Sequence, residues 1–280
     1  MRVTVLGAGT MGNGIAHVFA QHGHDVTLVD LNEAALERGL ATVAKNLDRQ
    51  VAKGTLSDDD KAATLARLAA STDLVASVQQ AELVVEAVSE RTEVKAEIFK
   101  TLDAHAPAAC ILASNTSSIS ITWIAAQTKR PAQVIGMHFF NPVPVMKLVE
   151  VVRGLATSDE TYATVKALSE ELGKTPVEVN DAPGFVSNRV LMPMINEAVF
   201  CVHEGVATPE AVDEVMRLGM AHPMGPLQLA DFIGLDVCLS ILNVLHTEFG
   251  DPKYRPCPLL KQMVTAGRLG RKSGQGFYAY

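Results

Sequence analysis

Cysteine is scarce in this sequence and follows no functional pattern. The chain has four cysteines in 280 residues, with no C-x-x-C pair and no histidine at metal-ligand spacing. We therefore expect reduced thiols, a reducing compartment and no metal site. Positive charge is not in excess either, because the net charge is −7, which argues against nucleic-acid partners.

Apolar runs long enough to cross a membrane are also missing. The most apolar stretch, 226–246, carries Asp231 and Asp236, so we expect no membrane span and no membrane partner. The first apolar strand pattern begins at residue 2, which predicts no signal or transit peptide and a cytoplasmic location. The composition is ordinary for a globular protein, and the length suits two domains.

A glycine-rich turn follows the first apolar run. Its spacing is G-x-G-x-x-G, formed by Gly7, Gly9 and Gly12. The first glycine permits the turn, the second lets a pyrophosphate approach the backbone, and the third lets the next helix pack on the strand. The N–H groups at the start of that helix then attract phosphate. The residues predicted to bind cofactor at this turn are Gly7, Gly9, Thr10, Met11 and Gly12.

A second apolar run ends in an acid, Asp30, which lies 18 residues after Gly12. A carboxylate at the end of the second strand accepts hydrogen bonds from a ribose diol and repels a 2′-phosphate. This favours NAD over NADP. Because strand, glycine turn, helix, second strand and acid all agree, the sequence predicts a dinucleotide site with NAD as its cofactor.

Apolar runs alternate with helical patterns up to about residue 180. This alternation predicts an α/β fold with a doubly wound, mostly parallel Rossmann-type sheet. The predicted NAD-binding domain spans residues 1–183 and carries a helical hairpin at 32–69. The predicted second domain, 184–280, is all-helical, and its long apolar helix needs a partner either in its own domain or in another subunit. Its expected helices are 185–204, 208–218, 227–247 and 257–266.

Basic residues recur on one side of the hairpin's first helix. Lys45, Arg49 and Lys53 stand at i, i+4 and i+8. One interpretation is a solvated helix face, which is usual for runs of charge. The other is a dock for an anionic ligand such as a nucleotide 3′-phosphate.

Two titratable residues lie near the end of neighbouring predicted strands. His138 ends one strand, and Glu150 follows twelve residues later on the next. An enzyme that oxidises an alcohol with a nicotinamide cofactor needs a base, and a carboxylate beside an imidazole fixes its orientation. The alternative is a core histidine beside an unrelated acid. The place at a strand end of a cofactor fold favours the catalytic hypothesis.

Three further polar residues have two open interpretations. Asn115 and Ser117 follow a predicted strand, where they either cap the turn or face a ligand. Asn188 lies in the first turn of a long helix, where it either caps that helix or reaches toward the substrate.

Seven segments resemble the L-3-hydroxyacyl-CoA dehydrogenase family, most closely its short bacterial members that act on 3-hydroxybutyryl-CoA. The resemblance covers nearly the whole chain. The segments are LGAGTMGNGIAHVFA (6–20), VVEAVSER (84–91), ASNTSS (113–118), GMHFFNPVPVMKLVEVV (136–152), PGFVSNR (183–189), AHPMGPLQLAD (221–231) and GRLGRKSGQGFYAY (267–280).

The resemblance implies an NAD-dependent, reversible oxidation of (S)-3-hydroxyacyl-CoA to 3-oxoacyl-CoA. It implies that His138 is the base with Glu150 as its partner, and that Ser117 and Asn188 hold the reacting oxygens. It assigns Asp30 to the adenosine ribose. The other cofactor contacts that it implies are Glu90, Lys95, Asn115, Ser117, Asn141 and Lys272.

The resemblance also bears on the partners of the chain. It places acyl-CoA against the helical hairpin, which favours the anionic-ligand interpretation of Lys45, Arg49 and Lys53. It implies a homodimer formed through the helical domain, which suits the apolar helix 185–204. Two rival functions remain open: an NAD-dependent dehydrogenase of a small hydroxy acid without CoA, and a non-catalytic dinucleotide-binding protein.

Overall fold

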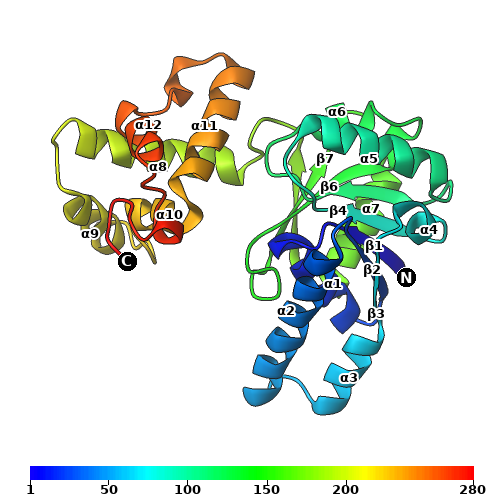
Figure 1. The fold of residues 1–280 in the computed structure, drawn as a ribbon. Coiled ribbons are helices and arrows are strands. Elements are labelled where there is room, and N and C mark those ends of the chain that lie inside the picture. Colours follow the sequence, from blue (N-terminus) through cyan, green and yellow to red (C-terminus); the bar gives the residue numbers. More distant parts are fainter. The chain divides into compact units, whose positions relative to one another are not determined.

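The computed structural model describes all 280 residues, which divide into two compact units, 1–181 and 182–280 (Figure 1). The first unit is built on one eight-stranded sheet in the order β3-β2-β1-β4-β5-β6-β7-β8. All neighbouring strands are parallel except β6 and β7. The strands are β1 (Arg2–Leu6), β2 (Asp25–Val29), β3 (Leu68–Ser71), β4 (Leu83–Glu86), β5 (Ile111–Ser114), β6 (Val134–Phe139), β7 (Leu148–Arg153) and β8 (Thr175–Asn180). This confirms the doubly wound, mostly parallel sheet.

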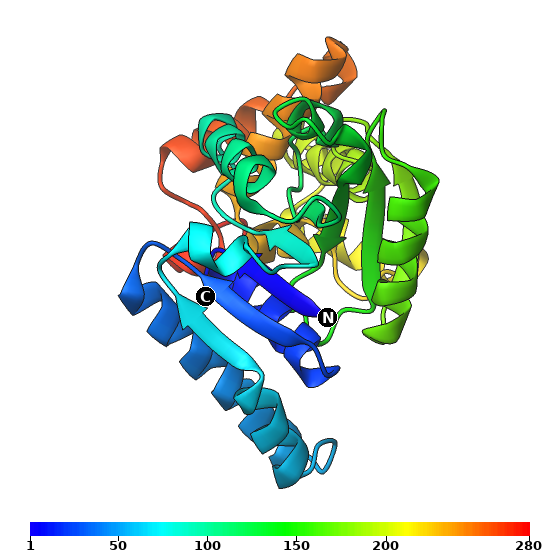
Figure 2. The ribbon, with the colours of Figure 1, turned by 90° about the vertical axis from the view of Figure 1, so that its right-hand side faces the viewer.

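Helices lie on both sides of this sheet (Figure 2). One core joins α1 and α7 to alternate strand residues, including Val5, Val85 and Met137. On the other face, α6 packs at Gly136, where an added Cβ would lie 3.1 Å from the Ile121 side chain. The helices are α1 (Thr10–Gln21), α2 (Glu33–Ala52), α3 (Asp58–Ala66), α4 (Leu74–Val78), α5 (Thr92–His105), α6 (Ile121–Ala125) and α7 (Asp159–Glu171), with a 3-10 turn η1 (Pro131–Gln133).

The helical pair α2 and α3 follows β2. The side chain of Asn32 accepts a hydrogen bond from Ala35 N at the start of α2, and Ser57 does the same for Asp60 N at the start of α3. These are ordinary N-caps, which satisfy N–H groups that the helix leaves unpaired. Lys61 bonds to Asp48 at 2.5 Å and ties the two helices together.

The strand β3 differs from expectation, because the helical hairpin predicted over 32–69 includes Leu68. That residue instead starts a four-residue strand parallel to β2. The strand reads LAAS and its two central alanines are exposed. An edge strand with small, exposed side chains has neither the alternation nor the β-branched residues that reveal strands in sequence.

The second unit is all-helical and has its own core. Its helices are α8 (Ser187–His203), α9 (Pro209–Gly219), α10 (Pro226–Ile233), α11 (Leu235–Phe249) and α12 (Pro258–Thr265), with 3-10 turns η2 (Pro252–Tyr254) and η3 (Arg271–Ser273). Met192, Ile195 and Val199 of α8 lie in this core. The exposed large apolar residues of the unit include Val215 and Leu218 on α9.

The single helix expected at 227–247 is wrong, because Gly234 divides it into α10 and α11. Gly234 has a φ of 106°, a backbone conformation that side chains disfavour and that glycine adopts freely. No one helix has the length and apolar content to cross a bilayer, while α10 and α11 meet those criteria only as a pair bent by 98°.

Two buried aspartates fix the end of the chain within the second unit. Asp231, on α10, accepts hydrogen bonds from Phe277 N and Tyr278 N, both at 3.0 Å. Asp213, on α9, accepts from Leu227 N and from the Tyr278 hydroxyl, both at 2.8 Å. Buried carboxylates with several donors make rigid anchors, so the C-terminal segment is part of the fold.

Candidate active site

The glycine turn joins β1 to α1 with little space to spare. Gly7 has a φ of 96°, and a Cβ added at Gly12 would lie 1.7 Å from the Gly7 carbonyl oxygen. A Cβ added at Gly9 would meet no atom within 4 Å, so the backbone at Gly9 is open to a ligand. The glycines therefore have the predicted geometry: a tight turn, close helix packing and one exposed approach.

The same turn carries features that fit a dinucleotide. No side chain caps the start of α1, and its first turn has no acidic residue. Its N–H groups are therefore available to a pyrophosphate. Asp30, at the end of β2, accepts hydrogen bonds from Ala8 N at 2.8 Å and Asn32 N at 3.0 Å. These bonds hold a half-buried carboxylate beside the turn, where a ribose diol would meet it.

His138 and Glu150 form a buried pair on the strands β6 and β7. The antiparallel register places the two residues directly opposite each other. Nδ1 of His138 lies 2.7 Å from Oε2 of Glu150, and the two residues are 7% and 2% exposed. Because a carboxylate accepts, Nδ1 carries a proton and donates it, which makes Nε2 the basic nitrogen of the neutral ring. The Phe140 ring lies 4.7 Å from the imidazole, centroid to centroid.

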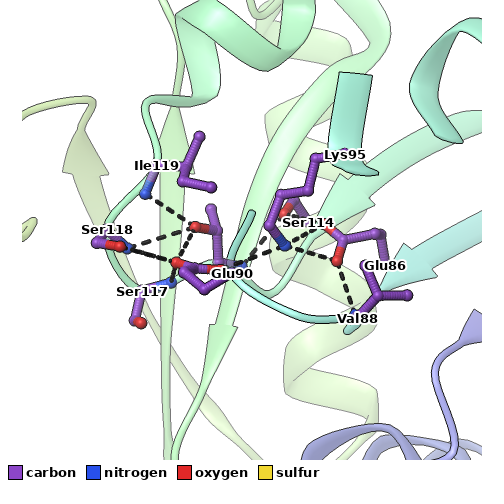
Figure 3. A network of polar contacts seen from close by, with 9 residues as sticks. Glu86, Val88, Glu90, Lys95, Ser114, Ser117, Ser118 and Ile119 are labelled. Carbon is purple, nitrogen blue, oxygen red and sulfur yellow. Dashed lines mark hydrogen bonds and ion pairs between the residues drawn. The ribbon is translucent and has the colours of Figure 1, made fainter. Parts of the chain in front are cut away.

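The loop after β5 is bound to one carboxylate, that of Glu90 (Figure 3). Its Oε1 accepts from Thr116 Oγ1 at 2.5 Å and from the backbone N–H groups of Ser117 and Ser118, both at 3.0 Å. Burial alone would raise the pKa of Glu90, but the Lys95 ammonium and these donors together hold it below its usual value. Ser117 is thus held at the carboxyl end of β5 through its own N–H group.

Beneath that loop lies a buried ion pair. Glu86, at the end of β4, is 0% exposed, and Lys95 is 1% exposed. The Lys95 ammonium lies 2.6 and 2.8 Å from the two oxygens of Glu86, and 3.3 Å from Oε2 of Glu90. Ser114 Oγ and Val88 N also donate to Glu86, at 2.6 and 2.8 Å. The Lys95 charge is therefore paired with both carboxylates beneath the loop after β5.

The remaining predicted residues are spread over both units. In the first, Asn115 bridges two strands, since its N–H donates to Glu86 O at 2.7 Å and its Oδ1 accepts from Phe139 N at 2.9 Å. Asn141 is exposed just past β6. In the second, Asn188 is buried in the first turn of α8, and Lys272 lies 2.5 Å from Asp236.

The three basic residues of α2 remain exposed. Lys45, Arg49 and Lys53 are all on the surface, and Arg49 donates only to Asn46, at 3.3 Å. Sequence reasoning missed Glu86, although the run LVVEAV shows a charge where a buried strand reads as apolar. A charge inside an apolar strand indicates a buried partner, and that was the available signal.

No group of three or more His, Cys, Asp and Glu side chains is arranged to hold a metal ion. All four cysteines are free thiols. Burial raises the pKa of Cys110 and of Cys238 to about 12, so neither is ionised at neutral pH.

A Rossmann-type sheet with a glycine turn, an acid directly after its second strand and a buried imidazole–carboxylate pair defines a nicotinamide-dependent dehydrogenase. The family model for the 3-hydroxyacyl-CoA dehydrogenase NAD-binding domain matches residues 2–182, and that for its C-terminal domain matches 184–280. The chain belongs to the 3-hydroxyacyl-CoA dehydrogenase family, whose members are NAD-dependent oxidoreductases.

Individual relatives agree over the full length. The chain is 60% identical over 279 residues to a probable 3-hydroxybutyryl-CoA dehydrogenase of Bacillus subtilis, covering 100% of this chain and 97% of that protein. The crystal structure of (S)-3-hydroxybutyryl-CoA dehydrogenase from Ralstonia eutropha has a TM-score of 0.97 and 54% identity, covering 100% and 98%. A diketoreductase described as acting on dicarbonyl compounds has a TM-score of 0.87 and 32% identity, covering 100% and 99%.

Proposed function

We propose that this chain catalyses the reversible oxidation of short-chain (S)-3-hydroxyacyl-CoA, with 3-hydroxybutyryl-CoA as its substrate, to 3-oxoacyl-CoA. The single observation that carries the chemistry is the 2.7 Å contact between His138 Nδ1 and Glu150 Oε2. It leaves one imidazole nitrogen for proton transfer and gives the imidazolium a buried counter-charge. The substrate is inferred from the names of the full-length relatives.

The proposed mechanism assigns one task to each group. His138 Nε2 takes the proton of the C3 hydroxyl. When bound, NAD would supply the acceptor for the C3 hydride. Glu150 fixes the imidazole and stabilises its protonated form. Ser117 and Asn188 hold the reacting oxygens, and the support for this is the family resemblance and the bound position of the Ser117 loop.

The proposed acyl-CoA partner binds along α2. Lys45, Arg49 and Lys53 are exposed, and none has an ion-pair partner within the first unit. A row of free cations on an otherwise acidic protein is suited to phosphate groups.

The substrate is tested by steady-state NADH oxidation with acetoacetyl-CoA and with free acetoacetate. We expect kcat/KM for acetoacetate to be lower by about a hundredfold or more, because binding energy from a remote part of the substrate is used at the reacting carbon. Equal rates would support a hydroxy-acid dehydrogenase without CoA. NAD binding with no turnover of any 3-hydroxyacyl-CoA would support the non-catalytic alternative.

We also propose a homodimer through the helical unit, with α9 as its centre. Val215 and Leu218 are 62% and 75% exposed, and they line a surface hollow with Ala211, Glu214 and Gly219. Exposed apolar side chains at helical spacing mark association surfaces. The core residues of α8, by contrast, are used within their own unit. A V215E/L218E variant is expected to elute as a monomer in light-scattering chromatography, and an unchanged dimer would exclude this surface.

A further inference from the structure

The buried residues Glu86 and Lys95 form one charge cluster with Glu90, whose side chain is partly exposed (Figure 3). Lys95 Nζ contacts both carboxylates, at 2.6 Å to Glu86 and 3.3 Å to Glu90. Each oxygen of Glu86 accepts two hydrogen bonds, so its carboxylate is fully engaged. The acceptor positions of this carboxylate are therefore used within the protein.

The charges of this cluster do not cancel. Two carboxylates and one ammonium leave one net negative charge. Glu90 keeps that charge at neutral pH, because Lys95 and the loop donors lower its pKa despite burial. Glu86 and Lys95 are almost inaccessible to solvent, and the Glu90 side chain is 35% exposed. Salt screens the buried Glu86–Lys95 pair weakly and the partly exposed Glu90 incompletely, so the net charge acts on its surroundings.

The cluster lies where the nicotinamide half of the cofactor belongs. We expect the adenosine end at Asp30, directly after β2, and the pyrophosphate at the glycine turn after β1. In a doubly wound sheet the dinucleotide crosses the carboxyl ends of the strands at the point where the order reverses, here between β1 and β4. The other half of the cofactor therefore faces the ends of β4 and β5, which hold Glu86 and Ser114.

We propose that the Glu86–Lys95–Glu90 cluster sets the preference of this protein between the two oxidation states of its coenzyme. The oxidised nicotinamide ring carries a positive charge and the reduced ring carries none. One net negative charge beneath the ring stabilises bound NAD⁺ relative to bound NADH. Glu86 acts here as a specificity-determining residue that contacts neither coenzyme nor substrate. This proposal rests on NAD binding and not on the base role of His138.

The test follows the net charge of the cluster through matched variants. Dissociation constants for NAD⁺ and for NADH are measured by calorimetry at pH 7.5 without acyl-CoA, and their ratio is the readout. Glu86→Gln leaves a net charge of zero, and we expect Kd(NAD⁺)/Kd(NADH) to rise about tenfold, which corresponds to about 1.4 kcal/mol. The double variant E86Q/K95M restores one negative charge on Glu90, and its ratio should return to within about twofold of the original.

The outcomes separate charge from position. A ratio that is the same in all three proteins would overturn the proposal. A ratio that shifts in E86Q and stays shifted in E86Q/K95M would also overturn it, because a displaced loop rather than the charge would then explain the effect. Losses of affinity common to both coenzymes cancel in the ratio, and failure of catalysis does not affect it.

Two further variants serve as a substitute for E86Q and as a control. If E86Q does not fold, as judged by its melting temperature, Glu90→Gln removes the same charge from the partly exposed end of the cluster and must raise the ratio. Glu97→Gln is the matched control, because it removes one negative charge from the surface of α5, the helix that carries Lys95. Glu97 pairs with Lys100 there and is 75% exposed. Its ratio should not change, and a shift equal to that of E86Q would contradict the proposal.

Discussion

The two halves of the first unit hold polar groups in different ways. In residues 1–81 the buried polar side chains are Thr4, Asn13, His17, His24 and Thr64, none of which is a lysine, arginine or carboxylate. In residues 82–181 the buried polar side chains include four charged residues, Glu86, Lys95, Glu150 and Lys174. The sheet is continuous across both halves. The difference therefore lies in what each half is built to hold.

The first half offers its ligand backbone groups and one half-buried acid, Asp30. Binding a pyrophosphate and a ribose needs no more, and water need not be excluded. The second half keeps charged side chains away from water, where a charge and its partner interact strongly. Under the proposed function, binding and proton transfer divide along the sheet, and we expect loss of a group in the second half to lower activity more.

The largest expected effect comes from the imidazole of the second half. His138→Ala should lower kcat by about two to four orders of magnitude, the range of general-base catalysis, with the Kd for NADH changed less than about threefold. Stopped-flow turnover and calorimetry measure the two. His105→Ala, at the exposed end of α5, is the control and should keep full activity. Near-normal turnover of H138A would remove the base assignment.

As pH falls, we expect the first half of the unit to lose stability at a higher pH than the second half. Burial lowers the pKa of His17 from 6.5 to about 4, so the unfolded chain binds more protons than the folded one between those values. Stability must then fall as pH drops from 6.5 to 4, by about 3 kcal/mol for this residue. Glu90 has the opposite dependence, since its lowered pKa contributes stability above pH 4.5, the ordinary value, that is lost only below it.

Urea unfolding at several pH values checks this difference. His17→Gln should flatten the decline between pH 6.5 and 4, whereas Glu90→Gln should be less stable than the original protein at pH 7 and equal to it well below pH 4. Hydrogen exchange should show opening at α1 at higher pH than at residues 114–119. The proposed difference between the two halves would be wrong if the free energy of unfolding of H17Q fell with pH as steeply as that of the original protein.

The partner of the base should matter less than the base. Glu150→Gln keeps a hydrogen bond to His138 but loses the charge, and we expect kcat to fall by about one to two orders of magnitude. Glu178→Gln on β8 removes an exposed carboxylate that pairs with Arg153 and is the control. If E150Q lost no more rate than E178Q, the pair would have only a structural role.

The sequence predicts the parts of this site that are local in the chain. The glycine turn and Asp30 lie within one strand–helix–strand unit, so spacing alone predicts a dinucleotide site, and the family confirms NAD. The His138–Glu150 pair is also predictable, since a short turn between adjacent strands sets its register. The doubly wound fold was predictable because strand and helix patterns alternate along the chain, and the observed sheet confirms it.

Other features depend on tertiary contacts that spacing does not encode. The cluster around Glu86 joins β4, α5 and the loop after β5, and its lysine is hidden in an ordinary amphipathic helix. The break at Gly234 was missed because an isolated glycine is tolerated in a helical pattern. The edge strand β3 was missed because its stability comes from β2 and not from its own residues.

In the first half, we expect substitution of Asp30 to have the largest effect on coenzyme binding. Asp30→Ala removes a charged acceptor for hydrogen bonds from the ribose hydroxyls, so the Kd for NAD should rise about ten- to a hundredfold. Discrimination against NADP should also weaken. Titration of both coenzymes measures this. Asp25→Ala, at the exposed opposite end of β2, should change neither. An unchanged coenzyme preference in D30A would contradict the ribose contact.

The smallest effects belong to the exposed cations of α2. Each of Lys45, Arg49 and Lys53 is replaced singly by alanine, and the residue that meets CoA phosphate should raise the KM for acetoacetyl-CoA about two- to fivefold, as expected of an exposed ion pair. The effect should shrink in 0.5 M salt, because exposed charges are screened. Lys100→Ala on α5 is the control, with an exposed lysine far along the chain from the hairpin. We expect kcat to stay unchanged in all three variants. A loss of kcat instead of a rise in KM would show that the basic residues of α2 do more than bind substrate.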